Sequence, residues 1–136
     1  MKKHIIKITT KLSDTEESIN ELTVTTEDID DIMCAALEGG ITYWCYKAKV
    51  VGQYLGDYGH EQIARGGILK LYDNEEDEVY ELTLEKLLMG IKKAYTEGYY
   101  SDYDWCDGKT LDCCQIDAEV ADTIVQCAIF DDVVYG

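Results

Sequence analysis

Three segments of the chain repeat apolar residues at helical spacing, and each starts beside a residue that can cap a helix. They are residues 26–38, 83–97 and 118–129. Thr83 and Asp117 are typical N-cap residues, and Thr25 with Asp28 resembles a capping box. The pattern therefore predicts three amphipathic helices with buried inner faces that include Ile32, Leu37, Leu88, Ile91, Ile124 and Val125.

Segments rich in β-branched and aromatic residues lie between and beside these helices. They predict strands at 4–10, 42–51, 67–72, 78–82 and 132–135. The third and fourth of these flank an acidic run at 73–77, which predicts a hairpin with an acidic tip. We expect short helices at 13–20 and 58–64 and a long loop at 99–115. The fold class is α+β: about three helices packed on an antiparallel sheet of four or five strands, in one domain spanning residues 1–136.

The charge balance is the most unusual part of the composition. The 136 residues include 28 acidic side chains and 12 lysines and arginines, a formal net charge of −16. A nucleic-acid-binding protein needs a basic footprint, and an anionic membrane attracts basic segments. We therefore expect no direct nucleic-acid binding and no membrane docking.

The cysteines and the N-terminus bear on location and metal binding. No apolar run reaches the length of a signal peptide or a membrane span, so we expect a cytoplasmic protein in the host cell. The six cysteines are then expected as free thiols. Cys106, Cys113 and Cys114 are close together, but no CxxC pair occurs, so we expect no metal site.

Signs of catalysis are sparse. His60 lies beside Glu61 and near Asp57, and these side chains together are the one candidate general base. The chain has no G-x-S-x-G elbow, no H-E-x-x-H motif and no P-loop. We expect a protein that is not an enzyme and needs no cofactor.

The acidic residues fall into blocks. From Leu12 to Glu38 there are nine Asp and Glu and no Lys or Arg, and a second such block runs from Asp73 to Glu85. A third block runs from Glu97 onward and contains a single basic residue, Lys109. Duplex DNA carries one charge per about 1.7 Å of axis, so sixteen charges match about 27 Å of duplex. If the blocks share one face, they fit a DNA mimic, whose partner-binding carboxylates would be Asp28, Asp30, Asp31, Asp73, Glu75, Glu76, Asp77, Asp102, Asp104 and Asp107. The alternative is acidity that only maintains solubility.

A small-molecule pocket is a second hypothesis. Glycine pairs let backbone amides approach an anion, and aromatic rings can stack on a nucleobase. The residues of such a pocket would be Tyr43, Trp44, Arg65, Gly66 and Gly67. Its ligand would be a cyclic or ADP-ribose-type signalling nucleotide.

Four stretches carry a resemblance: Asp28 to Cys45, Gln53 to Tyr58, Gln62 to Gly67, and Ile116 to Gln126. Together they resemble a family of small acidic proteins of bacteriophages and prophage-bearing gut bacteria. The resemblance implies an anti-defence role, such as that of anti-CRISPR or anti-restriction proteins or nucleotide sponges. It assigns no functional residue.

The leading hypothesis is a non-enzymatic phage or prophage protein that binds and inhibits a host-defence nuclease, with a CRISPR effector as the expected partner. A nucleotide sponge and a structural or regulatory phage accessory protein stay open as alternatives. A homodimer is also open.

Overall fold

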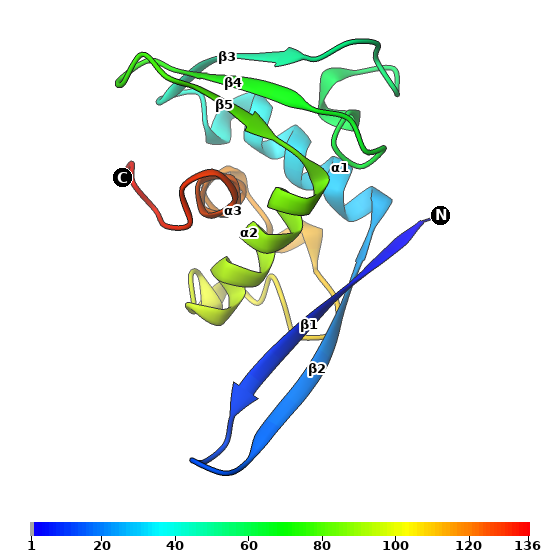
Figure 1. Cartoon of the computed structure of the whole chain (residues 1–136), viewed down its shortest axis with the longest axis vertical. Coiled ribbons are helices and arrows are strands. Elements are labelled where there is room, and N and C mark those ends of the chain that lie inside the picture. The colour runs from blue at the N-terminus through cyan, green and yellow to red at the C-terminus, as the bar shows by residue number, and fades with distance from the viewer. Residues whose placement is uncertain (1) are drawn as a thin grey trace.

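The two sheets lie at opposite ends of a layer of three helices in the computed structural model, which describes residues 2–136 (Figure 1). The first sheet pairs β1 (Lys3–Lys11) with β2 (Glu17–Thr25), and the second has the order β3 (Cys45–Val50), β4 (Leu69–Asp73), β5 (Val79–Leu82). The helices are α1 (Thr26–Ala35), α2 (Leu84–Thr96) and α3 (Ala118–Phe130). The α+β prediction is confirmed, with the five antiparallel strands divided between two sheets instead of forming one.

Side-chain caps start the three helices where the sequence predicted them. Thr25 Oγ1 accepts from the Asp28 amide at 3.0 Å, and Asp28 Oδ2 accepts from the Thr25 amide at 2.9 Å, which completes the capping box. Thr83 and Asp117 cap α2 and α3 with their side chains, which accept from the amides of Lys86 and Val120. The first helix is shorter than predicted, because its last turn, Ala36–Gly40, widens into a π-helical turn.

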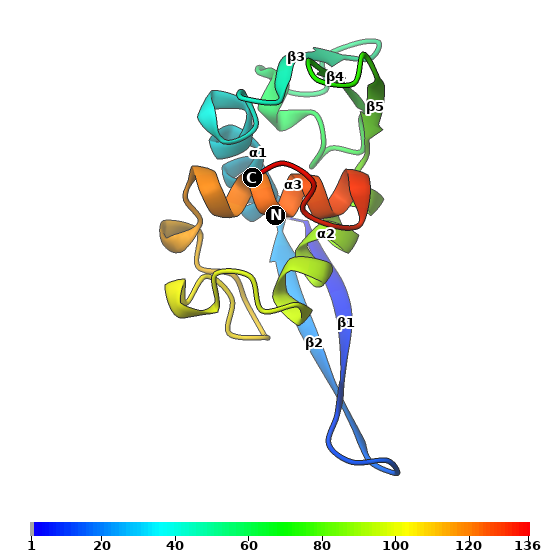
Figure 2. The ribbon, with the colours of Figure 1, turned by 90° about the vertical axis from the view of Figure 1, so that its left-hand side faces the viewer.

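The prediction of a short helix at 13–20 is wrong. A turn at 12–16 closes a hairpin instead, with the Leu12 amide donating to the Glu16 carbonyl, and β2 follows from Glu17. The apolar residues Leu22 and Val24 alternate along β2 and are buried, which is the period of a strand. The β1–β2 hairpin projects from the helices as an arm in both views (Figures 1 and 2).

Three other segments depart from the prediction. The strand predicted at 42–51 begins only at Cys45, because the amides of Trp44 and Cys45 both donate to the Ile41 carbonyl and form a turn. The helix predicted at 58–64 is a single 3-10 turn at Gly59–Glu61. The strand predicted at 132–135 is an extended tail that pairs with no strand.

The predicted loop at 99–115 has little regular structure. It holds two 3-10 turns, Ser101–Tyr103 and Cys113–Gln115, and one isolated bridge between Cys106 and Leu111. Trp105 anchors it, since this side chain is 2% exposed and donates from Nε1 to the Tyr99 carbonyl at 2.9 Å. The loop is therefore fixed to the core although it forms no long element.

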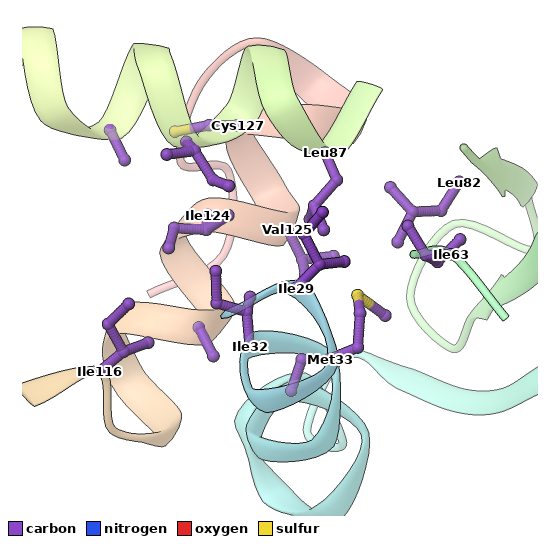
Figure 3. Packing of buried hydrophobic residues seen from close by; sticks show 14 of the residues in the cluster. Ile29, Ile32, Met33, Ile63, Leu82, Leu87, Ile116, Ile124, Val125 and Cys127 are labelled. Atoms are coloured by element: carbon purple, nitrogen blue, oxygen red, sulfur yellow. The ribbon is translucent and has the colours of Figure 1, made fainter. Parts of the chain in front are cut away.

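The core lies where the three helices meet (Figure 3). Ile32 of α1 faces Ile124 of α3, and Leu87 of α2 closes the other side. Of the predicted core residues, Ile32, Ile91, Ile124 and Val125 are buried, whereas Leu37 and Leu88 are only half-buried. The inner stripe of α2 is Leu87, Gly90, Ile91 and Ala94, so the burial prediction for Leu88 was one position off.

Within residues 2–136, no helix combines the length and the apolar composition needed to cross a membrane.

Candidate functional site

Two polar side chains, Asp122 and Gln126, lie one helical turn apart among the buried residues of helix α3. Asp122 is 8% exposed and Gln126 is fully buried. An i, i+4 polar pair in such a helix is the signal that could have marked this site in the sequence, and neither residue was among the predicted site residues. Both side chains face Tyr43, which follows α1, and the C-terminal tail.

Asp122 accepts three hydrogen bonds. Tyr43 Oη donates to Oδ2 at 2.6 Å, and Trp44 Nε1 and Gln126 Nε2 donate to Oδ1 at 2.8 and 3.0 Å. Burial and the hydrogen bond to this carboxylate raise the pKa of Tyr43 to about 12. The phenol therefore stays protonated at neutral pH and remains a donor.

Gln126 holds the C-terminal tail. Its Oε1 accepts from the amides of Val134 and Tyr135, both at 2.8 Å. The ring of Tyr135 stacks on Trp44 with centroids 5.5 Å apart, and its hydroxyl donates to Asp73 Oδ2 at 2.6 Å. The tail thus bridges α3 and the three-stranded sheet.

These contacts border a cleft of about 520 Å³. The end of the α1 segment, the start of α3, the tail and Tyr100 form its walls, and the residues that line it are Gly39, Gly40, Tyr43, Tyr100, Ala118, Glu119, Asp122, Thr123, Val133, Tyr135 and Gly136. The α1 segment and α3 meet closely there, since a Cβ on Gly40 would lie 2.5 Å from the Ala118 carbonyl oxygen. We call this hollow the tyrosine cleft.

Carboxylates dominate the exposed surface. In the described part of the chain, all acidic side chains are exposed except Asp28, Asp30, Glu61, Asp73 and Asp122. Salt bridges among these described residues reach only the carboxylates of Asp30, Glu61 and Glu97. Most of the carboxylates in the described chain are therefore open to solvent and outside any salt bridge.

Part of this charge gathers on one side of the molecule. The β4–β5 turn, the C-terminal tail and the segment after α2 all lie along the left of Figure 1, and Figure 2 looks onto that side. The start of α3 adds Asp117 and Glu119, and Glu119 also lines the tyrosine cleft. We call this surface the acidic face, made of Glu75, Glu76, Asp77, Asp102, Asp104, Asp117, Glu119, Asp131 and Asp132.

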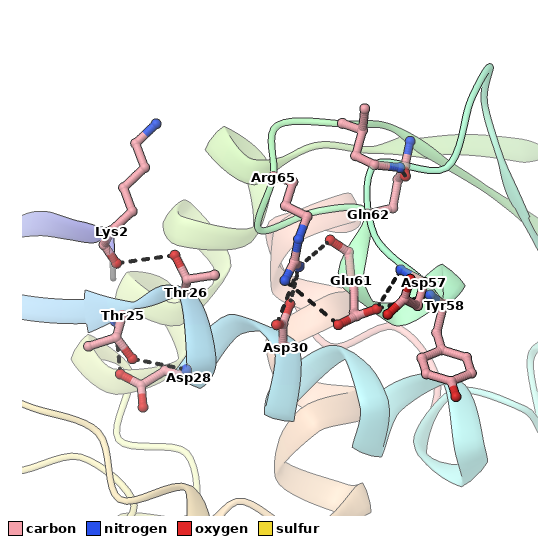
Figure 4. Close-up of polar contacts among 11 residues, drawn as sticks. Lys2, Thr25, Thr26, Asp28, Asp30, Asp57, Tyr58, Glu61, Gln62 and Arg65 are labelled. Carbon is pink, nitrogen blue, oxygen red and sulfur yellow. Dashed lines mark hydrogen bonds and ion pairs between the residues drawn. The ribbon is translucent and has the colours of Figure 1, made fainter.

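The predicted carboxylates of α1 lie elsewhere, because α1 begins on the other side of the molecule in Figure 1. Asp28 is half-buried in the capping box, and Asp30 pairs with Arg65 Nη1 at 3.1 Å (Figure 4). Asp31 is exposed. Burial and the charges of Glu27, Asp28 and Asp30 raise its pKa.

Two further predicted carboxylates have structural contacts. Asp73, expected at an exposed hairpin tip, is 2% exposed and accepts from the hydroxyls of Tyr80 and Tyr135. Asp107 is exposed, but its Oδ1 accepts from the amides of Lys109 and Thr110 and shapes the turn that carries it. The predicted partner-binding residues on the acidic face are thus Glu75, Glu76, Asp77, Asp102 and Asp104.

The residues of the predicted nucleotide pocket are not brought together. Tyr43 lines the tyrosine cleft, and Trp44 is fully buried beneath it. Arg65 pairs with Asp30 and Glu61 (Figure 4), and neither it nor Gly66 or Gly67 lines that cleft. The carboxylates in the cleft wall are unfavourable for a phosphate.

The contacts of the candidate base and of the cysteines are those of ordinary structural residues. Glu61 Oε1 accepts from the amides of Asp57 and Tyr58, and the His60 ring stacks on Tyr58 at 5.6 Å. All six cysteines are free thiols, and no group of three metal-binding side chains occurs among residues 2–136.

No family model matches the chain, and no curated protein or solved structure shows significant similarity to it.

Proposed function

We propose that this chain is a non-enzymatic inhibitor that binds the basic groove of a host-defence nuclease as a DNA mimic. A CRISPR effector is the expected target, and the cytoplasm of a cell that carries a phage or prophage is the expected setting. The observation that carries the proposal is the acidic face, where exposed carboxylates come from four segments that lie on one side of the molecule.

The physical basis is the similarity between this face and a phosphate backbone. A nuclease groove binds DNA largely through lysine and arginine contacts to phosphates, and binding releases the counterions condensed on DNA. Carboxylates held by a folded chain present the same sign of charge without a scissile bond. The net charge of −16 also repels DNA itself, so the nuclease is the better partner.

The test is competition for DNA. Guide-loaded CRISPR effectors and restriction nucleases would each be mixed with a labelled target duplex, and the anisotropy of the label would be followed as this protein is added. We expect at least one effector to release the duplex, and to do so less readily as salt is raised. Retention of the duplex by every nuclease at excess protein would contradict the proposal.

A further inference from the structure

The tyrosine cleft has a wall chemistry that differs from a typical apolar pocket. Three tyrosines, Tyr43, Tyr100 and Tyr135, line it together with the acidic residues Glu119 and Asp122. Its volume of about 520 Å³ lies within the range of small-molecule sites. None of its lining residues is a lysine or an arginine.

Asp122 is a nearly buried charge with no counter-charge. It is 8% exposed, all three of its hydrogen-bond donors are neutral groups, and no salt bridge in the described chain reaches it. Among the described residues only Tyr43 donates to its Oδ2, so one acceptor position of this oxygen is open. A buried carboxylate is most stable when a cation pairs with it.

The aromatic rings favour the same type of ligand. The face of a tyrosine ring carries partial negative charge and attracts ammonium and guanidinium groups. Tyr100 reaches the cleft with a backbone φ of 52°, which is unfavourable for a bulky residue. Strained backbone of this kind clusters at binding sites, where it positions a side chain.

We propose that the tyrosine cleft binds an organic cation, an alkylammonium or guanidinium group that pairs with Asp122 while its stem lies against the tyrosine rings. Glu119 at the rim would add attraction for the same charge. The ligand of this cleft differs from the partner proposed for the acidic face. The cleft needs a single cationic group, whereas the acidic face needs a basic DNA-binding groove.

The test is a titration of the isotope-labelled full chain followed by amide chemical shifts. Ethylguanidinium and n-butylammonium are the probes, and N-ethylurea is the neutral analogue of the first. We expect saturable shifts around Tyr43, Thr123 and Tyr135 with a Kd of about 1 mM or tighter for the cations. Equal binding of N-ethylurea, or no saturation by about 20 mM cation, would overturn the proposal.

Two variants separate the charge from the shape of the cleft. Asp122→Asn keeps an acceptor for Trp44, and Glu119→Gln alters only an exposed side chain, so the second remains informative if the first unfolds. Each should weaken cation binding about tenfold, whereas Glu21→Gln on the β1–β2 arm should change it less than about twofold. Unchanged binding by Glu119→Gln and by folded Asp122→Asn would contradict the proposal.

The affinities of spermidine and n-butylammonium distinguish two sources of the cation. Spermidine carries further ammonium groups that Asp117 and Glu119 would attract. Binding of spermidine much tighter than n-butylammonium would support a free polyamine as ligand. Equal binding of the two would support the end of a lysine or arginine side chain from a protein partner.

Discussion

At the scale of single residues, two buried carboxylates tie the C-terminal tail to the fold. Asp73 receives the Tyr135 hydroxyl, and Asp122 receives the Tyr43 hydroxyl. Tyr43 Oη also lies within 3.2 Å of the Tyr135 carbonyl, so the two carboxylates belong to one connected network. Charge-assisted hydrogen bonds of this kind are about twice as strong as neutral ones.

The titration of Asp73 should be visible in stability. Burial alone would raise its pKa, but hydrogen bonds from Tyr135, the Glu75 amide and Tyr80 outweigh burial and lower the pKa below 3.8. A lowered folded-state pKa stabilises the fold above the unfolded value, and this contribution is lost as the pH falls through the folded value. Urea unfolding at pH 7 should show Asp73→Asn less stable than wild type by about 1–3 kcal/mol.

The same measurement should show the difference between Asp73→Asn and wild type shrinking below about pH 4, because Asp73 of the unfolded chain is protonated first and Asp73 of the folded chain only at lower pH. Asp14→Asn in the exposed hairpin turn is the control and should match wild type throughout. A difference that stays constant down to pH 2 would show that the charge of Asp73 does not stabilise the fold.

Cysteine reactivity should follow exposure. Burial raises the pKa of the thiols of Cys106 and Cys127 to about 11, and burial with the charge of Asp28 raises that of Cys113 further. Cys114 is the exposed cysteine. Iodoacetamide at pH 7.5 should therefore label Cys114 first in the native protein, as read by peptide mass spectrometry. Faster labelling of Cys113 would contradict this arrangement.

At the scale of elements, the helices and four strands were predictable, whereas β2 was missed and the tail at 132–135 was wrongly predicted as a strand. A capped helix is encoded locally, by Thr25, Thr83 and Asp117 and the apolar period after them. The strand β2 depends on its pairing with β1, and the tail at 132–135 depends on Gln126. Such partners are distant in the sequence or lie on another element, so a pattern read along one segment does not reveal them.

The register of α2 gives a direct test at this scale. Leu87→Ala empties a fully buried position and should lower the free energy of unfolding by about 2–5 kcal/mol. Leu88→Ala removes a half-buried side chain and should cost about 1 kcal/mol. Denaturant unfolding of both variants shows which substitution lowers the free energy of unfolding more. A larger loss for Leu88→Ala would mean that Leu88, and not Leu87, faces the core.

The crossing of α2 and α3 should depend on Gly90. A Cβ at this position would clash with the Ile124 carbonyl oxygen and lie 2.8 Å from the Ala128 Cβ. Gly90→Ala should therefore destabilise the fold by about 1–3 kcal/mol in thermal unfolding, despite the better helix propensity of alanine. Gly39→Ala, where nothing lies within 4 Å of the added Cβ, is the control and should change little.

At the scale of the whole molecule, sequence alone shows how much negative charge there is but not where it gathers. The acidic blocks correctly located exposed carboxylates such as Glu76, Asp102 and Asp104. They did not reveal that α1 places Asp31 on another side, or that Asp73 is buried. The tyrosine cleft depends on contacts between α3, the tail and the turn after α1, so no single segment encodes it.

The central claim is that the position of the acidic face, and not net charge alone, drives binding to a nuclease groove. Two variants with equal charge loss separate these causes. The face variant is Glu76→Gln, Asp102→Asn and Asp104→Asn, and the arm variant is Glu16→Gln, Glu17→Gln and Glu21→Gln. All six carboxylates are exposed and none forms a salt bridge in the described chain.

The decisive measurement is the association rate of each variant with the nuclease identified by DNA competition, at salt concentrations from about 0.05 to 0.5 M. The face variant should associate at least about tenfold more slowly than wild type at low salt, with a shallower dependence on salt. The arm variant should stay within about threefold of wild type. Equal slowing of the two variants would show that net charge alone steers association and would contradict the account.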